Sequence, residues 1–422
     1  MAHIKYKYFD YIIKIINIFE FLRYYDENRS MNAAGKLFQS SIELTDDQLL
    51  VFKTEPYFSP YFFLLGGAKL PLEKAETILD SIFESQQEDG RIALFIKGIE
   101  TPFIQVPLHA GIIWQYVQEI EDKKIGRKLV KKYFEKLVHS HLYWYEHRDI
   151  EEDGLISIVH PVESLLPTSC AWDESLSSWK KRTPSMEEDI SAALFNKQKD
   201  LLTSFQKPEK EWAMKDPVVN TLLCWSNEAL IAMGKFIRKN VSEIIQWNEL
   251  ALYSMNEQLW DEEYGIYRGY DLITKELPLS GSIGGLLPLL AGIPVQEQAE
   301  AMLGALRLNF EKPDFYKLAS NSLYADVTQV EKPGRGGMSL LMNWLIFQGL
   351  SRFDLIDFAE QIKKDTVALV SEYGYYLHYL PQKDLVQNCG IGKGNNPFAV
   401  AILLHFIHTD VTFYQETSED PM

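Results

Sequence analysis

The stretch DGLISIVHPVESLLPTSCAWDESL, residues 153–176, is the most informative part of the chain. It places His160, Glu163, Trp172 and Asp173 in a segment that is rich in Ser and Pro and only weakly helical in pattern. Polar segments of this kind connect regular elements and often carry binding or catalytic groups. Taken alone, Glu163 and Asp173 also have simpler interpretations, as a helix cap and a solvated acid. The other segments of the chain are therefore needed to choose between a functional and a structural interpretation of these two acids.

Helical periodicity dominates the rest of the chain. Apolar residues recur at intervals of three and four in 71–85, 107–121, 126–143, 218–237, 241–257, 337–351, 353–370 and 397–408. Turns with a glycine separate these segments, at EEDG (151–154), DEEYG (261–265), KPGRGG (332–337) and SEYG (371–374). The loops alternate between long and short, and there is no fixed-period repeat of the kind that is typical of a solenoid. The sequence therefore predicts an all-α fold in which helical hairpins close into a toroid.

The predicted toroid accounts for most of the chain as one domain. Residues 41–412 form the predicted barrel, residues 1–40 an N-terminal helical extension and residues 413–422 a polar tail. The segment 180–215 is highly charged and has little pattern, and the composition does not change across it. We interpret it as a long loop over the barrel mouth rather than as a linker between two domains.

Composition and charge restrict the partners of the protein. The formal charge of −17 disfavours nucleic acid, and no run of Lys or Arg forms an evident compensating patch. Three widely spaced cysteines, Cys170, Cys224 and Cys389, include no C-x-x-C pair, which favours a reducing compartment, the cytoplasm. Residues 8–24 are predicted to form an amphipathic helix, with contact at a membrane surface as the less favoured alternative. No apolar run is long enough to predict a membrane span.

Five ordered motifs resemble those of glycoside hydrolase family 63 and its mannosylglycerate-hydrolase relatives. HPVESLLPTSCAWD (160–173) aligns without a gap with the family pattern His-Pro-Trp-Glu-Ser-Gly-x-Asp-Asn-Ser-Pro-x-Trp-Asp. The other four are TPFIQVPL (101–108), MKDPVVNTLL (214–223), SIGGLLPLLAGIP (282–294) and GRGGMSLLMNWLIFQGL (334–350). The resemblance spans about residues 55–408. It implies an (α/α)6 barrel with a pocket at one end.

The resemblance also implies an inverting mechanism that uses an Asp acid and a Glu base. Such chemistry needs two carboxyl groups roughly 6.5–9.5 Å apart, so that a water molecule fits beneath the sugar ring. The acid position aligns with Pro167, in ESLLP (163–167), and the base position with Leu377, in GYYLHYLP (374–381). Neither side chain transfers a proton. Ordinary hydrolysis is therefore not expected, because each lost acid or base removes a rate factor of about 10²–10⁴.

Positions that resemble sugar contacts are replaced as well. The replacements are Val162, Gly334 and Ser339 for Trp, and Ala171 for Arg. A looser match aligns FSPYF (58–62), with Phe58 and Tyr61, with a family element Trp-Asp-Ser-x-Phe. Because planar stacking and hydrogen bonds hold sugars, these replacements predict a less polar pocket and a changed ligand.

Several residues at motif positions are predicted to line the site: Gln105, Glu163, Trp172, Asp173, Asp216, Asn220, Arg335, Asn343, Leu377 and Tyr379. Glu163 and Asp173 are the first candidates for proton donor or cation stabiliser, because a carboxyl group in an apolar cavity has a raised pKa. His378 lies one position from the base and is either a proton relay or a packed aromatic residue. Further candidates are Asp326 at the pocket mouth and Glu372 as a displaced base.

Three functions stay open on this sequence. The favoured hypothesis is a barrel enzyme turned to cyclisation, isomerisation or elimination of a small, rather apolar molecule. The second is a glycoside hydrolase of small α-glucosides, α-mannosides or glycosylglycerates with displaced groups, such as Asp173 as acid and Glu372 as base. The third is a sugar- or metabolite-binding protein without catalysis. All three imply a small-molecule partner, and no motif predicts a metal ion, a cofactor or an oligomeric state.

Overall fold

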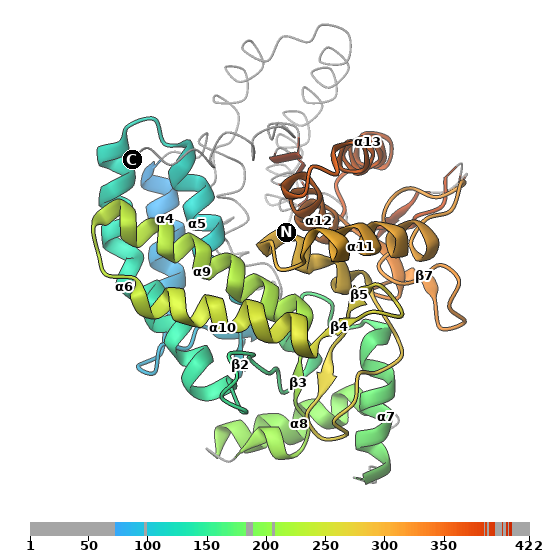
Figure 1. Cartoon of the computed structure of the whole chain (residues 1–422), viewed down its shortest axis with the longest axis horizontal. Coiled ribbons are helices and arrows are strands. Elements are labelled where there is room, and N and C mark those ends of the chain that lie inside the picture. The colour runs from blue at the N-terminus through green and yellow to red at the C-terminus, as the bar shows by residue number, and fades with distance from the viewer. Residues whose placement is uncertain are drawn as a thin grey trace, which may run out of the picture.

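Helical hairpins form a ring in the computed structural model (Figure 1). The structure describes residues 72–96, 99–182, 189–204, 207–383, 385, 388–392, 399, 402–403 and 405–406. The predicted extension 1–40, with its helix 8–24, and the predicted tail 413–422 lie outside the described residues. So do Phe58 and Tyr61.

Among the described residues, the inner layer of the ring includes α5 (His109–Glu119), α9 (Pro217–Ile237), the 3₁₀ helix η5 (Ile283–Ala291) and α12 (Leu340–Arg352). These helices are apolar on almost every side. The sequence IGGLLPLLA of η5 is buried throughout, and α12 is buried from Leu340 to Ser351. A helix of this kind is stable only when protein surrounds it, and neighbouring inner helices pack side by side in the order α5, α9, η5 and α12.

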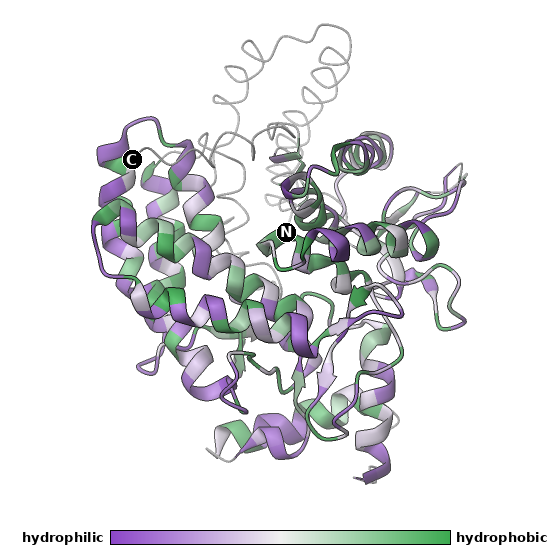
Figure 2. Cartoon of the chain, in the orientation of Figure 1, coloured by the Kyte–Doolittle hydropathy of each residue, from purple (hydrophilic) through white to green (hydrophobic). Residues whose placement is uncertain are grey.

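The outer layer consists of α4 (Leu72–Phe83), α6 (Lys123–Arg148), α10 (Ser242–Gln258), α11 (Gln296–Asn309) and α13 (Ile356–Tyr373). These helices are amphipathic, with polar residues on the side that faces away from the ring (Figure 2). Helices α6 and α10 pack on α9, α11 packs on η5, and α13 packs on α12. The prediction of an all-α fold of paired helices is confirmed.

Loop length alternates around the ring, as predicted. Short connections follow the inner helices, at 120–122, 238–241, 292–295 and 353–355. Long connections precede them, at 84–108, 149–216, 259–282 and 310–339. Because inner and outer helices alternate along the chain, the long connections and the N-termini of the inner helices share one end of the ring. Side chains cap three of these N-termini, Asp216 on α9, Ser282 on η5 and Ser339 on α12.

Short strands lie in the long connections at this end of the ring, where the inner helices begin. β1 (Ala93–Ile96) pairs with β2 (Ile99–Ile104), β3 (Met214–Lys215) with β6 (Tyr270–Asp271), and β4 (Trp260–Asp261) with β5 (Ile266–Tyr267), all antiparallel. A four-stranded sheet has the order β10 (Gly390–Ile391), β9 (His378–Tyr379), β8 (Gly336–Ser339) and β7 (Gln329–Pro333), in which only β7 and β8 run parallel among its pairs. The register of β8 and β9 places Ser339 opposite His378.

The prediction of a long loop at 180–215 is wrong. Helix α7 (Asp173–Arg182) extends into this segment, which also contains α8 (Ile190–Thr203) and the 3₁₀ turn η4 (Pro208–Lys210). Ala193 and Leu194 of α8 are buried in a cluster with Ile104 of β2. This tertiary contact stabilises a helix whose second half carries the charged and amide residues NKQKD (196–200). The helix predicted at 337–351 also starts later, at Leu340, because strand β8 precedes it.

Close packing of α12 on η5 depends on Gly349. A Cβ atom at this position would lie 2.7 Å from Leu290 N and 2.8 Å from Leu289 Cβ. We expect Gly349→Ala to lower the free energy of unfolding by about 1–3 kcal/mol, because the backbone of η5 has to move. The control is Gly304→Ala in α11, where a Cβ atom meets nothing within 4 Å, and a gain of up to about 1 kcal/mol in helix propensity is expected. Denaturant unfolding measures both, and equal effects would contradict the packing argument.

Candidate active site

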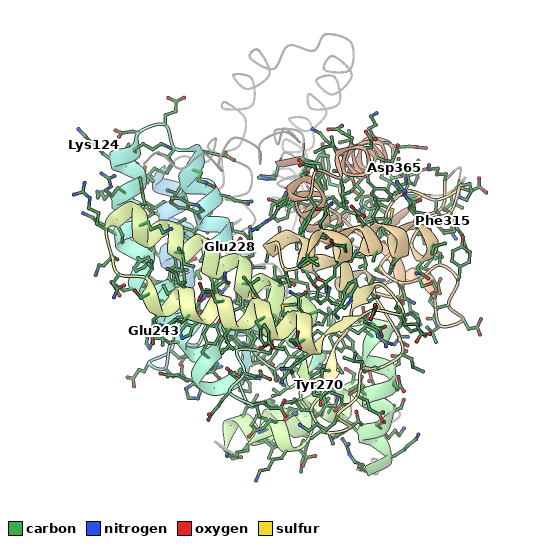
Figure 3. All side chains as sticks on the ribbon, in the orientation of Figure 1. Lys124, Glu228, Glu243, Tyr270, Phe315 and Asp365 are labelled. Carbon is green, nitrogen blue, oxygen red and sulfur yellow. The ribbon has the colours of Figure 1, made fainter. Side chains whose placement is uncertain are left out.

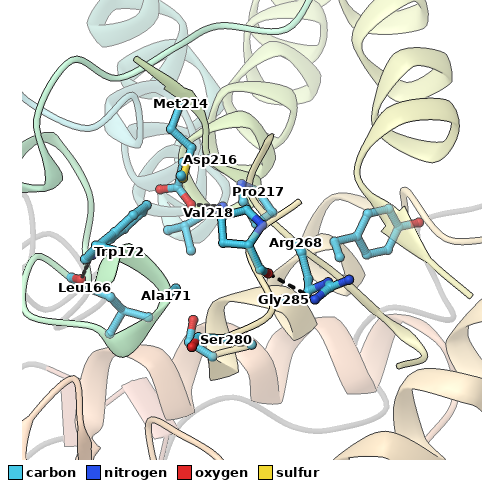
Figure 4. A pocket seen from close by; sticks show the side chains of 15 residues that line it. Leu166, Ala171, Trp172, Met214, Asp216, Pro217, Val218, Arg268, Ser280 and Gly285 are labelled. Carbon is cyan, nitrogen blue, oxygen red and sulfur yellow. Dashed lines mark hydrogen bonds between the residues drawn. The ribbon is translucent and has the colours of Figure 1, made fainter. Parts of the chain in front are cut away.

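A cavity opens where α9 and η5 begin (Figure 4). It contains about 400 Å³ of empty space, part of which is open to solvent. Its lining includes Leu166, Trp172, Asp216, Tyr267, Arg268 and Ser282. Of the predicted site residues that the structure describes, Trp172 and Asp216 are in this lining.

Asp216 is a buried carboxyl group in the cavity wall, with 2 % of its surface exposed. Val218 N donates a hydrogen bond of 3.2 Å to Oδ1, which caps α9, and Ser164 Oγ donates one of 2.8 Å to Oδ2. Burial raises the pKa of Asp216 to about 6, although these hydrogen bonds favour the charged form. Asp216 is therefore partly protonated close to neutral pH and is able to donate a proton.

Trp172 belongs to the segment 153–176, which its own side chains hold in place. The 3₁₀ turn η2 (Pro161–Glu163) begins where His160 Nδ1 accepts a hydrogen bond from Val162 N, and η3 (Cys170–Trp172) begins where Ser169 Oγ accepts one from Ala171 N. The indole Nε1 of Trp172 donates to Leu166 O at 2.7 Å. The two turns thereby present Leu166 and Trp172 to the same cavity.

Glu163 does not line the cavity. It is fully buried and forms a bidentate ion pair with Arg148, in which Nη1–Oε2 is 3.0 Å and Nη2–Oε1 is 2.8 Å. The same carboxylate accepts hydrogen bonds from Ile104 N (3.1 Å) and Val159 N (3.0 Å). These contacts attach the segment 153–176 to α6 and β2. The geometry gives Glu163 a structural role and does not support its predicted role as a proton donor.

Asp173 forms a second bidentate ion pair, with Arg335. Arg335 Nη1 lies 2.9 Å from Oδ2 and Nη2 lies 2.5 Å from Oδ1. Both side chains are partly exposed, at 36 % for Asp173 and 26 % for Arg335. Asp173 directly follows Trp172 of the cavity lining, is not itself part of that lining, and remains within reach of solvent.

The segments that carry Pro167 and Gly334 touch each other. Thr168 Oγ1 donates to Pro333 O at 2.5 Å. Gly334 has φ of +74°, and a Cβ atom there would lie 2.7 Å from Thr168 Oγ1. No larger side chain fits at 334 without a shift of this contact. Gly334, which aligns with a family Trp, therefore packs against the segment that follows Pro167, and this contact leaves no room for a Trp side chain.

Leu377, which aligns with the base of the family, directly precedes β9 of the sheet at the start of α12. Leu377 is buried, and its carbonyl oxygen accepts a hydrogen bond from Leu340 N at 3.0 Å. His378 Nδ1 is buried and has no hydrogen-bond partner among the described residues. Burial lowers the pKa of His378 to about 4, so the imidazole is neutral at pH 7 and its protonated form is disfavoured. Tyr379 donates its hydroxyl to Gly374 O at 2.6 Å and fixes the preceding turn.

The remaining predicted residues do not line the cavity. Gln105, Asn220 and Asn343 bind backbone oxygens, of Ala93 (3.0 Å), Ile156 (2.8 Å) and Lys317 (2.9 Å), respectively. Asp326 and Glu372 are exposed. Nor does the described part of the chain hold a group of three or more His, Cys, Asp or Glu side chains arranged for a metal ion.

Sequence reasoning missed Arg268. This residue pairs with Asp261, donates to Pro278 O at 3.0 Å and has a buried Nε without a partner among the described residues. It reaches the cavity because the β4–β5 hairpin folds back on η5. A lone Arg within the acidic and aromatic run DEEYGIYRGYD (261–271) was the available signal.

Comparison with known proteins identifies the family. The family model described as the mannosylglycerate hydrolase MGH1-like glycoside hydrolase domain matches residues 59–384. The chain belongs to this glycoside hydrolase family. It is 26 % identical over 377 residues to mannosylglycerate hydrolase MGH1 of Selaginella moellendorffii. This alignment covers 79 % of this chain and 76 % of the relative.

Solved structures of other glycosidases share the fold. The mannosylglycerate hydrolase of Thermus thermophilus in complex with glucose matches with a TM-score of 0.74 and 23 % identity, over 84 % of this chain and 93 % of that one. Neutral trehalase Nth1 of Saccharomyces cerevisiae matches with a TM-score of 0.59 and 14 % identity, over 82 % and 70 %. These likenesses confirm the predicted (α/α)6 barrel.

The favoured hypothesis of a cyclase, isomerase or lyase for an apolar molecule is wrong. The relatives that match most of the chain are named mannosylglycerate hydrolases. The error came from treating the apolar replacements as evidence for an apolar ligand, although an inner barrel wall is apolar for packing reasons. Hydrolysis, the second hypothesis, agrees better with these findings. No helix in the described ranges is long and apolar enough to cross a membrane.

Proposed function

We propose that this protein hydrolyses a small α-linked glycoside, with Asp216 as proton donor in place of the acid that Pro167 replaces. The observation that carries the proposal is a buried carboxyl group with a raised pKa in the wall of a cavity. A carboxyl group of pKa near 6 is suited to protonate the leaving oxygen of a glycoside close to neutral pH.

Ser164 and Leu166 connect Asp216 with the segment that carries Pro167. The Ser164 hydroxyl donates to Asp216 at 2.8 Å, and Leu166, the neighbour of Pro167, lines the same cavity. Position 167, where the family has its proton donor, and Asp216, the proposed donor here, therefore belong to adjoining parts of one site.

Asp173 is the proposed base. It follows Trp172 of the cavity lining, is partly exposed, and is oriented by the bidentate contact with Arg335. A carboxylate in such a position is able to accept a proton from water. His378, with its neutral imidazole, and Glu372 are the alternatives, to be compared by substitution.

The proposed substrate is a monosaccharide linked to a small group. Trp172 and Tyr267 contribute aromatic surface to the cavity wall. Because the named relatives are mannosylglycerate hydrolases, mannosylglycerate and other small α-mannosides or α-glucosides are the first compounds to test.

The test is a panel of aryl α-mannosides, aryl α-glucosides, mannosylglycerate and glucosylglycerate, with release of free sugar as the measurement. We expect turnover whose kcat/KM is level just below pH 6, the pKa of Asp216, and falls about tenfold per pH unit above it, because Asp216 then loses its proton. Saturable binding in calorimetry without product after long incubation would reject hydrolysis and favour a binding protein. Turnover that stays level up to about pH 8 would reject Asp216 alone.

A further inference from the structure

A basic surface runs along the solvent side of α6. Besides Lys132, six exposed cations lie within fourteen residues of the N-terminal part of this helix, KKIGRKLVKKYFEK: Lys123, Lys124, Arg127, Lys128, Lys131 and Lys136. We call this set of six the basic face. Apolar residues of the same helix, such as Leu129, Val130 and Tyr133, point into the core. Figure 3 shows Lys124 at the outer edge of the molecule, directed away from the ring.

The end of α9 extends this surface. Arg127 Nε donates to Phe236 O at 3.2 Å, which holds α6 against the last turn of α9. This turn contains Lys235, and Arg238 and Lys239 follow it. Two nearby acids are paired with other cations, Asp80 with Lys132 at 2.9 Å and Glu135 with Lys239 at 2.7 Å, whereas Glu121 and Asp122 are exposed directly before the helix. Lys124, Lys128 and Lys131 form no ion pair with any described residue.

This arrangement is unfavourable for the helix itself. Like charges stand four residues apart at Lys124 and Lys128 and at Arg127 and Lys131, and such pairs destabilise a helix. The chain as a whole carries a charge of −17, so the local excess of positive charge runs against its composition. The expectation that no basic patch exists is therefore wrong: the cations are close together in residues 123–136, and the helical period places them on the solvent side of α6.

We propose that the basic face binds an anionic phospholipid surface. A convex row of lysines on one amphipathic helix is typical of proteins that adsorb to anionic lipid head groups. Ile125 lies among these cations and is 38 % exposed, so it adds apolar surface at the point of contact. The sequence supplies a second signal in MAHIKYKYFDYIIKIINIFEFLRYY (1–25), which combines Lys and Arg with many apolar residues. Stable adsorption needs two such signals.

Charge complementarity favours lipid over nucleic acid. A nucleic-acid strand that continues past α6 would meet a protein surface of strongly negative overall charge, which repels it. A membrane contacts only the convex side that faces it. The basic face is on the outer layer, whereas the cavity is at the start of α9 and η5, so adsorption through α6 does not require the site residues.

The experiment is co-sedimentation of the full chain with vesicles of phosphatidylcholine, with and without roughly one quarter phosphatidylserine. We expect binding to the anionic vesicles only, and its loss on raising salt from about 0.1 M to about 0.5 M. The variant Lys124→Glu/Lys128→Glu/Lys131→Glu is expected to bind at least about tenfold more weakly. Its fold should persist, because the three side chains are exposed and lie among like charges.

The matched control is Lys180→Glu/Lys181→Glu/Arg182→Glu, the same change of charge in the last turn of α7. This variant is expected to bind like the unmodified protein. Equal loss in both triple variants would reduce the effect to net charge and overturn the proposal. So would equal binding to neutral vesicles, or tighter binding to duplex DNA than to anionic vesicles. Circular dichroism of each variant excludes unfolding as the cause.

Discussion

Asp216→Asn is expected to lower the rate of glycoside hydrolysis by about 10²–10⁴, the usual contribution of a general acid. Asparagine cannot donate the proton, but it caps a helix as well as aspartate does. Its Oδ1 can accept from Val218 N, and its Nδ2 can donate to the Ser164 hydroxyl oxygen, which accepts as well as donates. The loss of activity should therefore occur without unfolding. Steady-state kinetics on the best substrate of the panel measures it.

Asp189→Asn is the matched control. Asp189 caps α8 by accepting a hydrogen bond from Ala192 N at 3.1 Å, and it does not line the cavity. The same chemical change at this cap should leave the rate within about twofold, because it removes no proton donor. If both variants kept full activity, Asp216 would be a cap and nothing more.

A stability measurement provides an independent readout for Asp216. Its pKa is 3.8 as a free side chain and about 6 in the fold, so its favourable contribution is fully present below pH 3.8 and is lost as the pH rises through about 6. The loss is on the order of 3 kcal/mol, from about two pKa units. Asp216→Asn should therefore raise the free energy of unfolding relative to the unmodified protein at pH 8 but not at about pH 3.5.

Arg148→Met is expected to lower the free energy of unfolding by about 3–5 kcal/mol, because it leaves the carboxylate of Glu163 buried without its counter-charge. Both side chains are almost completely buried, at 3 % and 0 % exposure. The double variant Arg148→Met/Glu163→Gln should recover part of the loss, since no uncompensated charge remains. Denaturant unfolding of the single and double variants measures the coupling.

An exposed ion pair offers the comparison. Lys239 and Glu135 lie 2.7 Å apart with side chains that are 56 % and 68 % exposed. Lys239→Met is expected to cost less than about 1 kcal/mol, because water screens and solvates both charges. If Arg148→Met were no worse than Lys239→Met, the pair of Arg148 and Glu163 would not be the attachment that we describe.

The sequence by itself determined the architecture. Apolar residues spaced for helices predicted α4, α5, α6, α9, α10 and α13 to within a few residues at most boundaries. The described residues of 397–408 are helical too. The ordered motifs predicted the barrel class through their resemblance to glycoside hydrolase family 63. A pattern such as LLPLLAGIP by itself indicates only a segment that is buried on all sides. These features are local, so they can be read along the chain.

Only the tertiary structure decided the environments of the acids. Glu163 and Asp216 both stand in motifs, and nothing in their neighbours along the chain distinguishes them. Arg148, fifteen residues before Glu163, makes that carboxylate structural, and Ser164, fifty-two residues before Asp216, orients a carboxyl group that burial keeps partly protonated. Burial and pairing depend on contacts between distant segments. Burial and pairing determine whether a carboxyl group is held in an ion pair or stays partly protonated. They cannot be predicted from the residues next to it in the sequence.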